Sequence, residues 1–266
     1  MDDVTSARGR PFLRVDQHRA PVTAVYGGGG VFGIAYGLGV AHALIDAGVP
    51  LDQCDSLGTS AGSWVASCLA TGIGFGVMSQ QKAIRVPNLR PGFLRGVATD
   101  VFGERRDRRV RASAVRLPLR RELLSGLPLA DMVAASSSVP GVLAPARVAN
   151  HLYVDGGVRS MASAHLAPAA DHLLVVAPIA GPVMGRGGRT MELLLAEETH
   201  RWERRTAGRA HLIRPDAAIA AMVTAPHHLF DKERALDVYP MAYRQGARLI
   251  RERPNLSRLA AQPEAA

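Results

Sequence analysis

Two glycine-rich turns, separated by one helix-length segment, restrict what this chain can fold into. The first turn is GGGGVFG at residues 27–33, directly after a short apolar run, and the second is GTSAG at residues 58–62. The stretch between them, residues 33–47, is apolar almost all round a helix and is followed by a short return strand. This is the length of one βαβ unit, whose two turns emerge at the same carboxyl edge of a parallel sheet. If the two strands pair directly, the turns lie about 5 Å apart.

The rest of the chain repeats the alternation of buried strands and helices. Residues 172–177 read as a buried strand, and residues 190–209 and 232–253 read as helices. The pattern predicts an α/β fold: a three-layer α/β/α sandwich with a mostly parallel central sheet. A length of 266 residues suits one large domain. We expect a flexible N-terminal arm at 1–20, a single catalytic domain at 21–254 and a C-terminal tail at 255–266.

Composition excludes several classes of protein. Hydrophobic residues make up 47% and charged residues 21%, which is ordinary globular usage. No apolar run reaches the roughly 20 residues of a membrane-spanning helix, and the N-terminus lacks the apolar core of a signal peptide. The sequence therefore predicts a cytoplasmic protein. Cys54 and Cys68 are too few for a disulfide framework and lack metal-ligand spacing, so we expect reduced thiols, no metal and no cofactor.

The net charge of +9 leaves three explanations: nucleic acid, an anionic membrane, or background composition. Aromatic residues are only 5%, which argues against a nucleic-acid site that stacks exposed bases, so no nucleic-acid partner is expected. Residues 72–103 mix apolar side chains with arginines. This segment is either a cover that contacts an anionic lipid surface from the periphery of the membrane or, more simply, a region packed on the domain with its arginines exposed.

The second turn has a sequence that is typical of a serine nucleophile. Ser60 occupies the centre of a G-x-S-x-G sequence between a strand and a helix. The flanking Gly58 and Gly62 remove Cβ atoms that would clash in so sharp a turn. The helix that follows favours developing negative charge at its N-terminus, and the neighbouring glycine loop offers N–H donors for an oxyanion. The pattern favours acyl transfer through a serine.

A serine nucleophile needs a base, and Asp155 is the best acidic candidate. It ends a short apolar strand and is followed by Gly156 and Gly157. Histidine is the alternative base, because several histidines follow Asp155 and give the Ser, Asp, His order of an α/β-hydrolase triad. These are His165, His172, His200, His211, His227 and His228.

The glycine loop also matches a dinucleotide fingerprint. Gly28, Gly30 and Gly33 have the G-x-G-x-x-G spacing, and that fingerprint expects an acidic residue about 20 positions on. Asp52 and Asp55 are near that distance, but they precede or open the second strand rather than end it. A nucleotide-binding or catalytically silent protein therefore stays as an alternative.

Four blocks in this order resemble the patatin-like phospholipase family: GGGVFG at 28–33, GTSAG at 58–62, ASSSVPGVLAP at 135–145 and DGG at 155–157. The resemblance implies a serine acyl hydrolase of the lipase or phospholipase A type, acting on lipid acyl esters, with acyl transfer to another acceptor as a variant. It implies a Ser–Asp dyad without a catalytic histidine. Ser60 would be the nucleophile, Asp155 the general base, and the N–H groups of three glycines the oxyanion hole: Gly28, Gly29 and Gly30. Further glycines support these motifs: Gly33, Gly58, Gly62, Gly156 and Gly157.

The chain departs from the family pattern at three positions. The family loop usually begins with an acidic residue and has Arg or Lys before its last glycine, where this chain has Gly27 and Phe32. After DGG the family often has Asn where this chain has Ser163. A backbone oxyanion hole survives these changes, but a role for the basic side chain is lost or moved.

Overall fold

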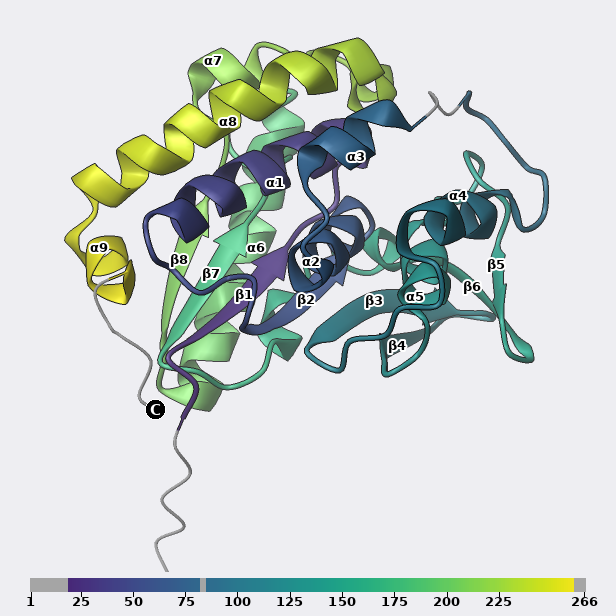
Figure 1. The fold of residues 1–266 in the computed structure, drawn as a ribbon, viewed down its shortest axis with the longest axis horizontal. Helices are drawn as coiled ribbons and strands as arrows, with labels where there is room; N and C mark the ends of the chain where they lie inside the picture. Colours follow the sequence, from purple (N-terminus) through teal and green to yellow (C-terminus); the bar gives the residue numbers. More distant parts are fainter. Residues whose placement is uncertain (1–18, 82–84, 261–266) are drawn as a thin grey trace, which may run out of the picture.

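A computed structural model of the chain describes residues 19–81 and 85–260. They form an eight-stranded mixed sheet with helices on both faces, which confirms the expected α/β fold (Figure 1). Five strands pair in parallel in the order β3-β2-β1-β7-β8. Their bounds are β1 Val22–Tyr26, β2 Asp55–Thr59, β3 Val110–Arg116, β7 His172–Val176 and β8 Arg209–Ile213.

The other end of the sheet is antiparallel, and of its strands only the short apolar one that ends in Asp155 was predicted from the sequence. It contains β4 (Arg120–Ser125), β5 (Ala146–Val148) and β6 (His151–Asp155), with β4 and β6 both pairing with β3. The sequence of β4, RRELLS, lacks a buried apolar run because only one of its residues is fully buried. A strand of three residues such as β5 leaves no usable periodicity.

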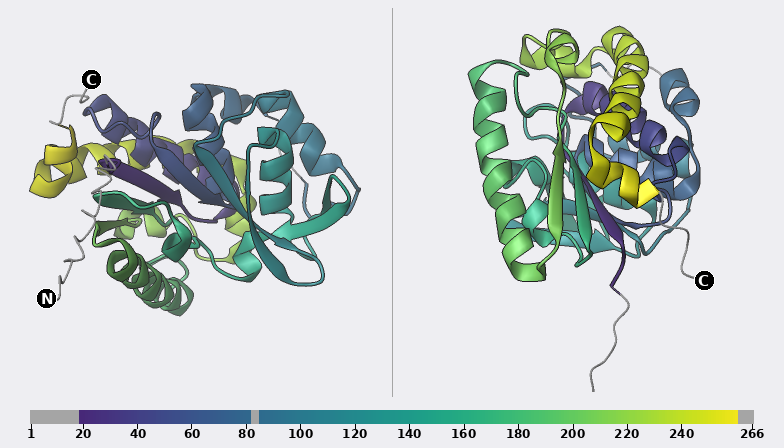
Figure 2. Two further views of the ribbon diagram at one scale, coloured as in Figure 1. Left: turned by 90° about the horizontal axis from the view of Figure 1, so that it is seen from below. Right: turned by 90° about the vertical axis from the view of Figure 1, so that its left-hand side faces the viewer.

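The parallel strands lie between two helical layers. On one face α1 (Gly30–Asp46) packs on the sheet and beneath α8 (Lys232–Glu252), and α2 (Ala61–Thr71) lies beside α1. The helix α6 (Arg186–Thr206) covers the opposite face, as the right-hand view of Figure 2 shows. The apolar character of α1 on all sides follows from this position, since it is covered by the sheet below and by α8 above.

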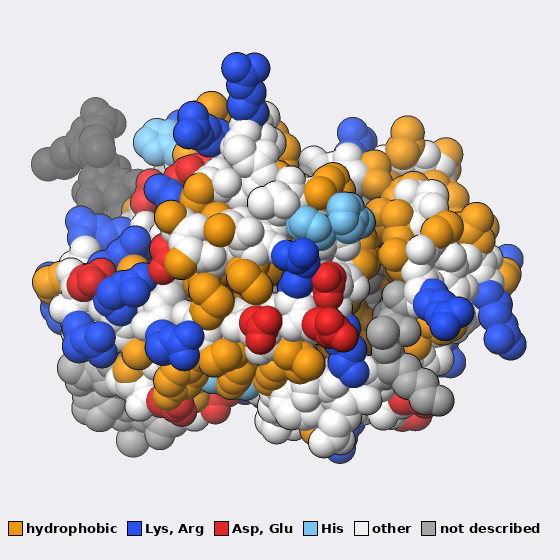
Figure 3. Space-filling view, turned by 90° about the horizontal axis from the view of Figure 1, so that it is seen from above, with side chains coloured by type: hydrophobic (Ala, Val, Ile, Leu, Met, Phe, Trp, Pro, Cys, Tyr) orange, Lys and Arg blue, Asp and Glu red, His pale blue; other side chains and the backbone are white. Residues whose placement is uncertain are grey.

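The segment 72–103 forms two short helices, α3 (Phe75–Gln80) and α4 (Phe93–Phe102). The helix α4 packs on α5 (Leu129–Ser137) through four buried residues, Leu94, Ala98, Val101 and Phe102. The loop before α4 is open to solvent, with the Leu89 side chain 61% exposed. Figure 3 shows hydrophobic side chains gathered on the end of the molecule that contains α4, at the right of the view, with basic side chains among them.

The packed part of the chain extends further toward the C-terminus than expected. Residues Pro254–Ala260 form the helix α9, and Leu256 and Leu259 are buried in the core. The expected tail from residue 255 therefore begins too early, because these two leucines complete the layer that contains α8. Most of the expected N-terminal arm, residues 1–18, lies outside the described residues, as do residues 261–266. None of the described helices has the length and hydrophobicity needed to cross a membrane.

Gly62 is the position where the fold tolerates a side chain least. A Cβ built there would lie 1.8 Å from the carbonyl oxygen of Tyr26, so β1 and the start of α2 would have to separate. We expect Gly62→Ala to lower the free energy of unfolding by about 3 kcal/mol or more, the upper range for overpacking. Urea unfolding monitored by circular dichroism measures this change.

Gly96→Ala is the matched control, because Gly96 is exposed within α4 and a Cβ there meets nothing within 4 Å. That substitution should leave stability unchanged or raise it by up to about 1 kcal/mol. Equal destabilisation by both substitutions would contradict the packing described for Gly62.

Candidate active site

The register of β3 brings the ends of two other strands together. Along one edge of β3, the parallel strand β2 pairs as far as Thr59 opposite Ser113. The next position on that edge, Ala114, pairs with Asp155 of the antiparallel strand β6. Since β2 and β6 run toward each other along the same edge, their final residues meet. Ser60, which follows Thr59, and Asp155 are thereby placed at one point of the sheet.

Ser60 occupies a sharp turn between β2 and α2. Its backbone has φ 54° and ψ −122°, a conformation that costs a non-glycine residue about 1–3 kcal/mol. The two flanking glycines make the turn possible: a Cβ at Gly58 would lie 2.4 Å from the backbone of Gly62. The Ser60 side chain is almost fully buried and stands at the N-terminus of α2, and the first turn of that helix contains no acidic residue of its own.

Buried serine hydroxyls hold this turn in place. The N–H of Ser60 donates to the hydroxyl of Ser136 (3.0 Å), and that hydroxyl donates to the carbonyl oxygen of Ser113 (2.7 Å). The hydroxyl of Ser63 donates to the carbonyl oxygen of Ser60 (2.7 Å). Both backbone groups of the strained residue are therefore satisfied by side chains rather than by water. The sequence analysis missed Ser136, although a run of serines in an otherwise apolar buried helix is a usable signal.

The glycine loop lies against the nucleophile. A Cβ built on Gly28 would be 3.5 Å from the Ser60 Cβ, so the loop and the turn are in contact. The N–H of Gly28 donates to the carbonyl oxygen of Met161 (2.8 Å). The oxyanion role of Gly28 stays a prediction, and in this structure its N–H is bonded within the fold. Gly29 and Gly30 remain, at the N-terminus of α1, with no backbone acceptor among the described residues.

Two of the departures from the family pattern have structural explanations. Phe32 is fully buried and stacks on Tyr36 with ring planes 9° apart. No residue of the loop 27–33 is charged, so nothing there replaces the Arg or Lys of the family pattern, and the loop offers only backbone groups. Ser163 has φ 56°, a left-handed conformation that Asn adopts readily, and its hydroxyl bonds that of Ser113 (3.0 Å). A serine there keeps both the turn and a link to β3.

Asp155 is 4% exposed and is fixed by its backbone as well as its side chain. Its N–H donates to the carbonyl oxygen of Ser138 (2.9 Å), and its Oδ1 accepts from the N–H of Gly157 (2.6 Å). Its Oδ2 is buried without a hydrogen bond of standard geometry to any residue in the described ranges. Burial raises the pKa of Asp155 to about 6, while hydrogen bonding from Ser60 and from Gly157 acts in the opposite direction. The carboxylate is thus a stronger base than an exposed one.

Ser60 and Asp155 both open into a cavity of about 520 Å³. Its lining is largely aliphatic and aromatic and comes from distant parts of the chain, among them α1, α2, the 72–103 segment, the 137–143 segment, residues 155–161 and the loop 226–230. Representative residues are Ile34, Trp64, Val97, Leu143, Leu229 and Phe230. The backbone of Leu229 lies directly over the glycine loop, since a Cβ on Gly30 would be 2.5 Å from its carbonyl oxygen. Among the described residues, Lys232 is the cation that lines this cavity, and it donates to the carbonyl oxygen of Gln81 (2.7 Å).

The histidines of the alternative triad and the aspartates of the dinucleotide fingerprint do not line this cavity. No histidine is among the described residues that line it. His172 and His211 bond each other at 3.0 Å, and His165 lines a different cavity. Asp55 begins β2, so it lies at the opposite end of that strand from Ser60, and Asp52 precedes it. Within residues 19–81 and 85–260 no group of three or more His, Cys, Asp or Glu side chains could hold a metal ion.

Comparison with known proteins supports the resemblance. A family model described as patatin-like phospholipase matches residues 91–168, which confirms the expected similarity to that family. The matched region includes Asp155 and the serine-rich block at 135–145, whereas the glycine loop and Ser60 lie before it. A search of curated proteins found no match. The family match implies an enzyme with lipid acyl hydrolase activity.

The raised pKa of Asp155 predicts a pH-dependent cost to stability. A carboxyl whose pKa is about 6 when folded and near 3.8 when unfolded favours the folded state below pH 4, and this advantage disappears as the pH rises through 6. Asp155→Asn should therefore be more stable than the parent above pH 6, by about 3 kcal/mol at most, since each pKa unit corresponds to about 1.4 kcal/mol.

Chemical denaturation of both proteins between pH 4 and pH 8 measures the difference. Asp237→Asn, an exposed carboxylate on α8, provides the control. A difference between Asp155→Asn and the parent that stays constant over this pH range would contradict a raised pKa.

Proposed function

We propose that this protein hydrolyses acyl esters of lipids through a Ser60–Asp155 dyad. The observation that carries the proposal is the junction on β3, where β2 and β6 end against each other and deliver a serine and a carboxylate to one apolar cavity. The strained turn at Ser60 adds weight, because such a conformation is kept where it positions a reacting atom.

In the proposed reaction the Ser60 hydroxyl attacks the ester carbonyl and transfers its proton to Asp155. The buried Oδ2, which has no hydrogen bond of standard geometry within the described ranges, is the oxygen available to take that proton. The carbonyl oxygen becomes an oxyanion, and the alcohol then leaves with the proton from Asp155. Water repeats the sequence on the acyl-enzyme and releases the acid. A pKa of about 6 suits this role, since general bases work best near the operating pH.

The oxyanion would be held by the N–H groups of Gly29 and Gly30. Both lie at the N-terminus of α1, and the N-terminus of α2 starts beside Ser60, so two helix dipoles favour negative charge there. A well-placed donor of this kind contributes about 3–4 kcal/mol to the transition state. The aliphatic lining of the cavity fits an acyl chain. Transfer of the acyl group to an acceptor other than water follows the same first half of the reaction.

Covalent labelling tests the nucleophile and the base separately. We expect a fluorophosphonate probe to label the parent protein at Ser60 and to leave Ser60→Ala unlabelled, since the probe traps an activated serine. Ser79→Ala, a change at a partly exposed serine of α3, serves as the control and should keep full labelling. Asp155→Asn should reduce both labelling and ester hydrolysis by about 100-fold to 10,000-fold, the usual contribution of a general base.

Histidine substitutions separate the dyad from a triad. Single changes to Ala at His165, His172, His200, His211, His227 and His228 should each retain at least about a tenth of the parent rate, well above the loss expected for a missing base. Peptide mapping of the labelled protein and a panel of short-chain and long-chain esters give the readouts. Loss of activity in one histidine variant that still folds, with activity kept in Asp155→Asn, would overturn the dyad.

We also propose that the loop before α4, residues 85–92, contacts an anionic lipid surface. Exposed Leu89 lies between the exposed cations Arg85 and Arg90, and the neighbouring Val86 lines the catalytic cavity. Apolar side chains that insert into lipid and arginines that meet headgroups are the usual combination for peripheral binding.

Vesicle sedimentation tests this contact. The double change Arg85→Gln with Arg90→Gln should weaken binding to vesicles of phosphatidylcholine and phosphatidylglycerol by about 30-fold, which corresponds to about 1 kcal/mol for each arginine. The matched control changes Arg244 and Arg251 to Gln, two exposed arginines of α8. Binding that is equal for neutral and anionic vesicles, and insensitive to salt, would contradict the proposal.

A further inference from the structure

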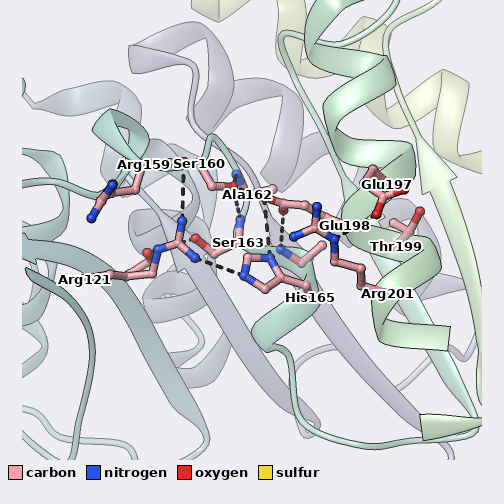
Figure 4. A network of polar contacts seen from close by, with 12 residues as sticks. Arg121, Arg159, Ser160, Ala162, Ser163, His165, Glu197, Glu198, Thr199 and Arg201 are labelled. Carbon is pink, nitrogen blue, oxygen red and sulfur yellow. Dashed lines mark hydrogen bonds and ion pairs between the residues drawn. The ribbon is translucent and has the colours of Figure 1, made fainter. Parts of the chain in front are cut away.

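A second cavity, of about 250 Å³, lies behind the catalytic loops. It is bounded by β4, by the turn at 159–163, by the 3-10 helix Ala164–Leu166 (η2) and by α6, and Figure 4 shows the polar side chains that surround it. Met161 lines both this cavity and the catalytic one. The turn that contains Met161 therefore lies between the two spaces, and it also supports the glycine loop through the bond from the Gly28 N–H to the Met161 carbonyl oxygen.

Arg121 brings a positive charge to this cavity without a balancing carboxylate. Its Nη1 donates to Nε2 of His165 (3.0 Å), and its Nη2 donates to the carbonyl oxygen of Arg159 (3.4 Å), as Figure 4 shows. Its Nε is buried without a hydrogen bond to any residue that the structure describes. Arg159 likewise donates to a carbonyl oxygen, that of Leu119 (3.2 Å). Neither arginine forms an ion pair with any carboxylate of the described ranges 19–81 and 85–260.

The acidic side chains at the cavity are already engaged. Glu198 accepts from the hydroxyl of Ser160 (2.5 Å) and from the N–H of Ala164 (2.8 Å). Because Nε2 of His165 accepts from Arg121, the proton of that imidazole is on Nδ1, which faces Glu198 at 3.5 Å. Glu197 pairs with Arg201 at 2.9 Å. Glu198 therefore has only neutral donors, but the lining as a whole contains three arginines, Arg121, Arg159 and Arg201, against the two glutamates. The excess charge of the described lining is positive, so the cavity favours an anion.

The remaining wall of the cavity is apolar. It consists of Met161, Ala177 and Ala180 together with Met191, Leu194 and Leu195 of α6. Leu194 is 58% exposed, which leaves a hydrophobic side chain partly in water beside the opening. The volume is equivalent to about eight water-sized units of about 30 Å³ each. That space holds a short alkyl chain and excludes a long one.

We propose that this cavity binds a small amphipathic anion, with its charged head against Arg121 and a short alkyl chain against Leu194 and Leu195. The site goes beyond the proposed hydrolysis, and binding there does not require Ser60 or Asp155. A bound chain would touch Met161, so it would act on the segment that fixes Gly28 and, next to it, the Gly29 and Gly30 donors.

Calorimetric titration of the full chain with octanoate, octyl phosphate and octanol tests the site. We expect one of the two anions to bind with a stoichiometry of one and the neutral alcohol to bind at least about tenfold more weakly, the contribution of one charged hydrogen bond. The tighter of the two anions identifies the head as a carboxylate or a phosphate. Acetate and inorganic phosphate, which lack the chain, should bind more weakly than their octyl counterparts.

Two pairs of variants locate the ligand. Arg121→Gln should weaken binding about tenfold or more, whereas Arg120→Gln, on the neighbouring exposed residue of β4, should not change it. Leu194→Gln should weaken binding, whereas Leu193→Gln, which is 73% exposed and does not line the cavity, should not. Thermal unfolding confirms that each variant folds. Since Leu194 is on the surface of α6, that pair remains informative even if Arg121→Gln fails to fold.

Three results would overturn the proposal. One is binding of octanol as tight as that of the anions. Another is anion binding that is unchanged in Arg121→Gln and in Leu194→Gln. The third is binding that is lost in Val97→Arg, which narrows the catalytic cavity, but kept in Arg121→Gln, because the ligand would then occupy the catalytic cavity. None of these readouts depends on turnover, so a failure of the hydrolase proposal would leave this test intact.

Discussion

The shared edge of β3 is the constraint on which the site depends. One strand pairs with β2 over its first half and with β6 over its second half, in opposite directions. Two chain segments nearly 100 positions apart are therefore aligned by main-chain hydrogen bonds rather than by side-chain contacts. The same strand supplies the Ser113 carbonyl that anchors Ser136, and through it the turn at Ser60. The glycine after Asp155 is required there, because a Cβ on Gly156 would lie 2.3 Å from that carbonyl oxygen.

Exclusion of water has two effects at this site. The lining that fits an acyl chain also surrounds Asp155, and this burial raises the pKa of its carboxyl group. If the proposed function holds, substrate selection and the strength of Asp155 as a base have one physical origin. The strained backbone of Ser60 is retained because its N–H donates to the buried Ser136 hydroxyl, which replaces water, and its carbonyl oxygen accepts from the hydroxyl and the N–H of Ser63.

The parts of the fold that the sequence predicted well are those governed by local rules. The strand, glycine loop, helix and serine turn from β1 to α2 follow from spacing and apolar periodicity, and Figure 1 shows them as consecutive neighbours. The charged strand β4 and the three-residue strand β5 depend on pairing with distant segments, so no local pattern marks them. The bond from Gly28 to Met161 and the role of Ser136 were missed for the same reason. Each joins residues that are far apart in the chain.

The buried Phe32 has a consequence for how the loop responds to its surroundings. Where an arginine or lysine would add a mobile charge, this chain adds only an aromatic ring stacked on Tyr36. The loop therefore acts on an anion through peptide dipoles alone. Peptide groups neither gain nor lose protons in water of ordinary acidity, and they are fixed by the helix that they begin. The electrostatic field of the loop is thus constant, and Asp155 remains the part of the dyad that responds to acidity.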